Sequence, residues 1–164
     1  MWKSASLLCI VVVLNEVSGV NSKEPILGRK CPSGWQKFGS QCFKFFKEQK
    51  TWAEAEQHCI ELGGNLAPIH SQVTNNYLKS LVKKENGAMT RTWIGGHDAT
   101  EDFIWFWSDG SKFDYKDWHT GEPNNGARVE KCMEMGYGEE QRWNDARCST
   151  KLFFICFRLS RIEL

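Results

Sequence analysis

The sequence predicts one α+β domain, because two helical patterns early in the chain are followed by short, aromatic-rich strand patterns. The chain has 164 residues, of which 41% are hydrophobic, 13% aromatic and 25% charged. This composition suits one globular domain with a real core. The formal net charge of +1 favours neither nucleic acid nor an anionic membrane surface as a partner.

Periodicity and end signals predict the two helices. Residues 51–64, TWAEAEQHCIELGG, open with Thr51 and Glu54 at capping-box spacing and stop at two glycines. Cys59 falls on the buried stripe of this helix, so we expect it to bond to a core strand. A second helix is expected from about Ser71 to Asn86. Its predicted inward-facing residues are Val73, Leu78, Leu81 and Val82.

The rest of the chain is predicted to form strands and loops. Residues 31–42, CPSGWQKFGSQC, indicate a hairpin closed by a local disulfide. Further strand candidates are TWIGG, DFIWFWSDGSKF, KCMEMG, RWND and LFFICF, with Trp93, Trp105 and Trp107 expected in the core. The stretch 109–131 has few aliphatic residues, and loops of that length in a compact domain tend to be functional.

The N-terminus has the layout of a cleaved secretory signal over residues 1–19, with one lysine, an apolar run and small residues near its end. The apolar run from Ala5 to Leu14 is shorter than the roughly 20 residues that span a bilayer. We therefore expect a secreted, extracellular protein without a membrane span. Residues 20–30 form a short leader before the main domain.

The cysteines indicate three disulfides. Removal of Cys9 with the signal leaves an even set in an exported protein. Spacing alone does not decide which of the remaining six cysteines pair. A zinc site is less favoured, because CxxC and HxxxH pairs are absent.

Two clusters rich in acids and amides, GEPNNGARVEKC (121–132) and RWNDARC (142–148), fall in predicted loops. Each alone would be an ordinary polar turn or cap. Together, each just ahead of a cysteine, they favour a hard cation such as calcium, which takes about 6 to 8 oxygen ligands. The proposed ligands are Glu122, Asn124, Glu130, Asn144 and Asp145. A cis Glu122–Pro123 bond is our hypothesis for turning the two flanking side chains toward one point.

Over residues 31–158 the chain resembles the C-type lectin-like domain family, in particular secreted single-domain lectins of fish and venoms. The resemblance rests on CPSGWQKFGSQCF, the Cys59 helix, TWIGG, IWFWSDGS, GEPNN, RWND and FICF. It implies two helices, small antiparallel sheets and a long calcium-binding loop, followed by a C-terminal tail at 159–164. It also implies three disulfides: Cys31–Cys42, Cys59–Cys156 and Cys132–Cys148.

By the same resemblance, the five oxygen-bearing residues bind both calcium and carbohydrate. Two adjacent sugar hydroxyls replace water on the ion. The carboxylates accept hydrogen bonds from these hydroxyls, and the amides donate hydrogen bonds to them. The order EPN implies mannose-type sugars, with fucose, N-acetylglucosamine and glucose as relatives, whereas QPD goes with galactose. A second calcium site is expected at Asp98 and Asp102, where the family often has acidic ligands. It should be weaker than the first, because Asn125 and Lys131 stand where calcium-rich members often carry aspartate.

The resulting functional expectation is a mannose-binding lectin of innate immunity that recognises microbial glycans. An enzyme is disfavoured, because HExxH, nucleophile-elbow and CxxC motifs are absent. The alternative is a non-sugar use of the fold, as in type II antifreeze, mineral or eggshell matrix, or receptor-binding venom proteins. One sugar site binds with about millimolar affinity, so we expect avidity through a noncovalent homo-oligomer.

Overall fold

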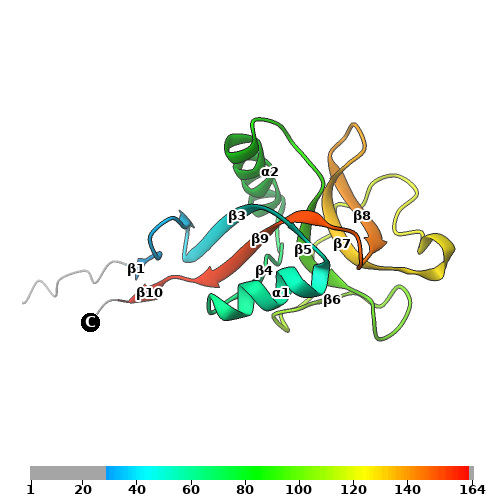
Figure 1. The fold of residues 1–164 in the computed structure, drawn as a ribbon, viewed down its shortest axis with the longest axis horizontal. Helices are drawn as coiled ribbons and strands as arrows, with labels where there is room; N and C mark the ends of the chain where they lie inside the picture. Colours follow the sequence, from blue (N-terminus) through cyan, green and yellow to red (C-terminus); the bar gives the residue numbers. More distant parts are fainter. Residues whose placement is uncertain (1–28, 163–164) are drawn as a thin grey trace, which may run out of the picture.

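The computed structural model describes residues 29–162 (Figure 1). The expected signal at 1–19 and the leader as far as residue 28 lie outside the described residues. The elements confirm the α+β class and follow in this order: β1 (Arg29–Lys30), β2 (Gln36–Phe38), β3 (Gln41–Lys50), α1 (Trp52–Glu61), β4 (Asn65–Leu66), α2 (Gln72–Asn86), β5 (Thr92–His97), β6 (Phe106–Trp107), the 3-10 turn η1 (Gly126–Arg128), β7 (Glu130–Tyr137), β8 (Arg142–Arg147), β9 (Leu152–Leu159) and β10 (Arg161–Ile162).

Most strands join one sheet of order β2-β3-β9-β5-β7-β8, in which β4 also pairs with β9 and β6 with β5. The pairing of β5 with β9 is parallel, and the other pairings in this sheet are antiparallel. Strands β1 and β10 form a separate two-stranded ribbon. Figure 1 shows this ribbon at one end of the molecule and β7, β8 and the long loop at the other.

Helix α1 begins with the capping box that the sequence predicts. The Thr51 side chain accepts from the Glu54 amide at 3.3 Å, and the Glu54 carboxylate accepts from the Thr51 amide at 2.9 Å. That backbone hydrogen bond from Thr51 is the main reason that the pKa of Glu54 is lowered. The opposite face buries Ala55 and Cys59 against the sheet.

Helix α2 is capped by Ser71 and stops at Gly87, which adopts φ 82° and donates its amide to the Lys83 carbonyl. Three of the four predicted inward residues, Leu78, Leu81 and Val82, are buried. The prediction for Val73 is wrong, since this side chain is 67% exposed. Val73 lies in the first turn, about 130° around the helix from the centre of the buried stripe. The first buried residue of that stripe is Thr74.

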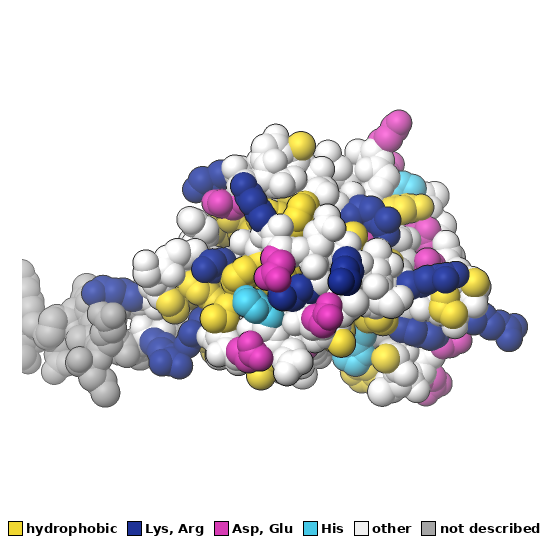
Figure 2. Space-filling model, viewed as in Figure 1, with side chains coloured by type: hydrophobic (Ala, Val, Ile, Leu, Met, Phe, Trp, Pro, Cys, Tyr) yellow, Lys and Arg dark blue, Asp and Glu magenta, His cyan; other side chains and the backbone are white. Residues whose placement is uncertain are grey.

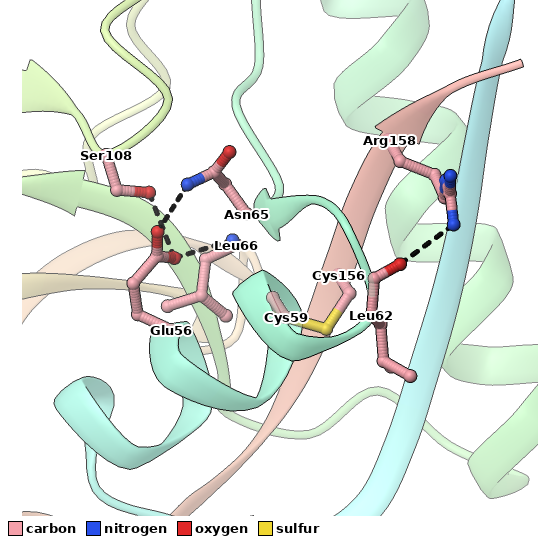
Figure 3. The surroundings of a disulfide bond; sticks show 8 residues. All are labelled: Glu56, Cys59, Leu62, Asn65, Leu66, Ser108, Cys156 and Arg158. Atoms are coloured by element: carbon pink, nitrogen blue, oxygen red, sulfur yellow. Dashed lines mark hydrogen bonds between the residues drawn. A yellow bond between two sulfur atoms is a disulfide. The ribbon is translucent and has the colours of Figure 1, made fainter.

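The three disulfides have the implied pairing, Cys31–Cys42, Cys59–Cys156 and Cys132–Cys148. The second joins α1 to β9, which confirms that Cys59 bonds to a core strand (Figure 3). Next to it, the buried carboxylate of Glu56 accepts from the Asn65 side chain at 2.6 Å, the Leu66 amide at 2.7 Å and the Ser108 hydroxyl at 3.1 Å. This carboxylate ties α1 to β4 and to the residue after β6.

Two buried clusters cover the sheet, one under α2 and one under α1. The prediction that Trp93, Trp105 and Trp107 are core residues is confirmed, because each is at most 8% exposed. Trp118 is partly buried and packs on Trp105 at a centroid distance of 4.7 Å, so it anchors the long loop to the core. Within residues 29–162, no helix is long and apolar enough to cross a membrane.

Candidate functional site

The strand ladder between β7 and β8 brings the two predicted ligand clusters together. Glu130 opens β7, and Asn144 and Asp145 lie in the middle of β8. In the antiparallel register Asn144 faces Glu134 and Asp145 faces Met133. The loop that carries Glu122 and Asn124 ends where β7 begins.

Asp145 holds the loop by its carboxylate. The side chain is fully buried, and its two oxygens accept from the backbone amides of Asn124 at 3.0 Å and Asn125 at 2.6 Å. These bonds fix the turn that follows the Glu122–Pro123 peptide, which is cis as hypothesised. The two clusters, separate in the sequence, thus share one set of hydrogen bonds.

Glu130 and Asn124 face the same narrow space beside Gly126. The Glu130 carboxylate accepts from the Gly126 amide at 2.9 Å. A Cβ atom on Gly126 would stand 2.6 Å from Glu130 Oε2 and 3.3 Å from Asn124 Oδ1. A side chain at this position would therefore fill the space between these two oxygens, and glycine keeps it open.

Glu122 completes a group of three neighbouring acids. Its Oε2 atom is buried and has no hydrogen-bond partner among the described residues. Burial raises the pKa of Glu122, and the hydrogen bond with Asp145 and the negative charges of Asp145 and Glu130 raise this pKa further. Clustered carboxylates with an unpartnered oxygen fit a hard cation, which would neutralise their mutual repulsion.

Asn144 is oriented by Glu134, a residue that sequence reasoning missed. The Asn144 amide nitrogen donates to Glu134 Oε1 at 2.8 Å, and Arg91 Nε lies 2.9 and 2.8 Å from the two Glu134 oxygens. With one N–H engaged, the Asn144 amide keeps its oxygen and its second N–H for a ligand. Burial raises the pKa of Glu134, and the hydrogen bonds from Arg91 and Asn144 oppose that rise.

Asp117 anchors the long loop beneath this site. Its carboxylate accepts from Asn75 at 2.6 Å, Lys79 at 2.9 Å and Arg142 at 2.9 Å. The Asp117 carbonyl also accepts from the amide of Trp143, the residue before Asn144. Helix α2, the loop and β8 are therefore joined at one buried carboxylate, which was not among the predicted residues.

The donor set of the candidate site fits calcium better than a softer metal. It combines three carboxylates with two amides, and it contains no histidine or thiolate. Within the described part of the chain, no three acidic, histidine or cysteine side chains form a metal cluster by themselves. A complete coordination sphere would therefore also need the amide oxygens of Asn124 and Asn144.

The expected second site is assembled differently. Asp98 is 1% exposed, with one oxygen accepting from the Phe103 amide at 2.8 Å and the other buried without a partner in residues 29–162. Burial raises the pKa of Asp98. Asp102 forms an ion pair with Lys131. Lys131 thus neutralises one of the two carboxylates.

A family model described as the Lectin C-type domain matches residues 48–158, more than half of the chain. The chain belongs to the C-type lectin family. The cysteine pairing in this C-type lectin agrees with the resemblance seen in its sequence.

Relatives of this C-type lectin include two fish lectins. Ladderlectin of Oncorhynchus mykiss is 47% identical over 119 residues, which cover 73% of this chain and 63%, less than two thirds, of ladderlectin. The galactose-specific lectin nattectin of Thalassophryne nattereri is 46% identical over 126 residues, covering 77% of this chain and 79% of nattectin. These relatives are named as lectins, not as enzymes.

The fold is also similar to that of the herring type II antifreeze protein. The two structures give a TM-score of 0.74 at 34% identity, covering 80% of this chain and 100% of the antifreeze protein. The fold is therefore shared by proteins whose names point to different ligands.

Proposed function

We propose that this C-type lectin is a secreted protein that binds sugars through calcium at Glu122, Asn124, Glu130, Asn144 and Asp145. The observation that carries the proposal is the bridge from Asp145 to the amides of Asn124 and Asn125, which unites the two clusters of oxygen ligands. Calcium, when bound, supplies coordination positions for two adjacent sugar hydroxyls. Around it, the carboxylates accept hydrogen bonds from the hydroxyls and the amides donate to them.

The proposed specificity is for mannose-type sugars. Glu122 places a pure acceptor before the proline and Asn124 places a donor-bearing amide after it, the order that the family associates with mannose. The name of nattectin states galactose specificity for a relative that is 46% identical. The sugar preference of this chain therefore needs a direct comparison of the two sugars.

The proposed role is recognition of microbial glycans by several sites at once. All six cysteines in the described residues are paired within the chain, so none of them is free to bridge two subunits. A noncovalent homo-oligomer is the proposed route to avidity. A second, weaker calcium ion at Asp98 and Asp102 is part of the same proposal.

Retention on immobilised mannose and immobilised galactose, each with calcium and then with a chelator, tests this function. We expect retention on mannose that is lost on chelation. Retention on galactose alone would refute the mannose preference but keep the calcium-dependent lectin. Failure on both resins, with calcium binding intact by calorimetry, would refute sugar binding at this site.

The second candidate is ice binding, which is favoured by the similarity to herring type II antifreeze protein over that protein's full length. An ice-growth assay separates the two functions. Faceted ice crystals and thermal hysteresis without retention on sugar would support this candidate, whereas ordinary ice growth would exclude it.

A further inference from the structure

Arg147 lies at the end of β8 beside the candidate ligands. In the β7–β8 register its Cα atom pairs with that of Glu130. A register shift separates this pair from the regular ladder, in which Cys132 pairs with Ala146. The side chain is exposed. The backbone of this exposed arginine therefore lies beside that of one proposed calcium ligand, Glu130.

Arg128 lies on the other side of Glu130 along the chain. It ends η1, where its amide donates to the Asn125 carbonyl at 2.7 Å, and its side chain is exposed. This turn connects Gly126, whose amide binds Glu130, to the start of β7. The loop thus holds a second arginine at the edge of the same site.

Neither of these guanidinium groups has a hydrogen bond, ion pair or ring contact within residues 29–162. Other arginines of the domain do: Arg91 binds Glu134, Arg142 binds Asp117, and Arg158 binds the Leu62 carbonyl. Figure 2 shows Lys and Arg side chains gathered with acidic ones at the end of the molecule that carries the long loop.

The charge balance around the site makes these two arginines relevant to the ligand. The three carboxylates carry one more negative charge than a calcium ion carries positive charge. Arg128 and Arg147 add two positive charges at the rim of the site, and neither is paired within the described residues. A neutral sugar gains nothing from this field, whereas an anionic substituent within a Debye length of about 8 Å would be attracted.

We propose that Arg128 and Arg147 form a subsite for a sulfate or phosphate ester carried by the bound sugar. This inference rests on the proposed sugar-binding function. The planar fork of a guanidinium pairs with two oxygens of such an ester at once. An ester at carbon 6 leaves the 3- and 4-hydroxyls free, so one sugar can occupy both the calcium ligands and the arginines.

The test compares methyl mannoside with its 6-sulfate and its 6-phosphate, and methyl galactoside with its 6-sulfate. Each is titrated into the calcium-loaded full chain by calorimetry, at about 0.05 M and about 0.5 M salt. We expect the esters to bind about five- to tenfold more tightly than the parent sugar at low salt. The preference should shrink at high salt, because ions screen exposed charges.

The double variant Arg128→Gln, Arg147→Gln should lower the ratio of ester to parent affinity to about one. The matched control is Arg161→Gln, an exposed arginine in β10 at the opposite end of the molecule, which should leave the ratio unchanged. Equal loss in both variants would show a nonspecific charge effect and overturn the subsite.

Two outcomes separate this inference from the function it rests on. If the parent sugars bind with calcium but the esters bind no better, the subsite is refuted and the lectin function stands. If neither the parent sugars nor the esters bind, both proposals fail together. The Tm of each variant confirms that it is folded, which is expected because both arginines are exposed.

Discussion

The amide nitrogen of Asn144 donates to the buried carboxylate of Glu134 directly across the β7–β8 ladder, at 2.8 Å. Glu134 is fully buried and also receives the Nε–H of Arg91. This pair holds the Asn144 amide in one orientation. Glu134 is therefore a positioning residue for the candidate site.

The first prediction is that Glu134→Gln weakens calcium binding about ten- to hundredfold, the usual effect of losing a partner that orients a metal ligand. Glutamine brings its own amide hydrogens, so Asn144 is no longer held in one orientation. Calcium titration by calorimetry measures the change. Glu139→Gln, at an exposed acid in the turn after β7, is the control and should bind like wild type. An unchanged Kd in Glu134→Gln would show that Asn144 needs no such partner.

The second prediction concerns stability in calcium. Free calcium at about 100 times its Kd should stabilise the fold by about 2.7 kcal/mol, because the ion binds only the folded chain. For a domain of this size that corresponds to a rise in Tm of roughly 10 °C, measured by scanning calorimetry with and without chelator. The variant Asp145→Asn should lose the rise, whereas Glu140→Gln, at an exposed acid, should keep it. A rise that persists in Asp145→Asn would place the ion elsewhere.

The third prediction is a change of sugar preference in the double variant Glu122→Gln, Asn124→Asp. The exchange reverses the order of acceptor and donor around Pro123 and should shift retention from mannose toward galactose. Calcium calorimetry on the same protein serves as the control, because a variant that has lost the ion gives no information on preference. The same mannose-to-galactose ratio as in wild type would contradict the assignment.

The fourth prediction is that Asp117→Asn destabilises the domain by about 2 kcal/mol, since the buried carboxylate loses its charge-assisted hydrogen bonds from the partly exposed Lys79 and Arg142. Urea unfolding measures the loss. The control, Asp114→Asn, breaks a pair with His70 in which the carboxylate is exposed, and it should leave stability nearly unchanged. Similar losses in both variants would mean that Asp117 is not a structural anchor.

Local signals were sufficient for the parts of the fold that depend on near neighbours. Thr51 and Glu54 are three residues apart, so their capping box is readable in the sequence. The prediction for Val73 was wrong because an apolar residue in the first helical turn matches the helical spacing of hydrophobic residues. In the folded domain the helix packs against the sheet through a different face, so Val73 is exposed. Periodicity finds a helix more reliably than it finds the edge of its buried stripe.

The sequence indicates the donor types of the candidate site but not its supporting contacts. Carboxylates and amides in two loops indicate a hard cation without any knowledge of the register. Arg91 and Glu134 lie 43 residues apart, and only the order of strands brings them together. The one available signal was an acid inside the apolar strand KCMEMG, a position where a charge needs a partner.

The β1–β10 ribbon has a consequence for how this domain can be presented. Residue 29 pairs with residue 162, so both ends of the described fold leave from the pole opposite the long loop. Copies tethered by either end, on a bead or through fused scaffold proteins, would all point their long loops and the candidate site outward. Such a one-sided array would present many weak sites to a surface at once, without any contact between the domains themselves.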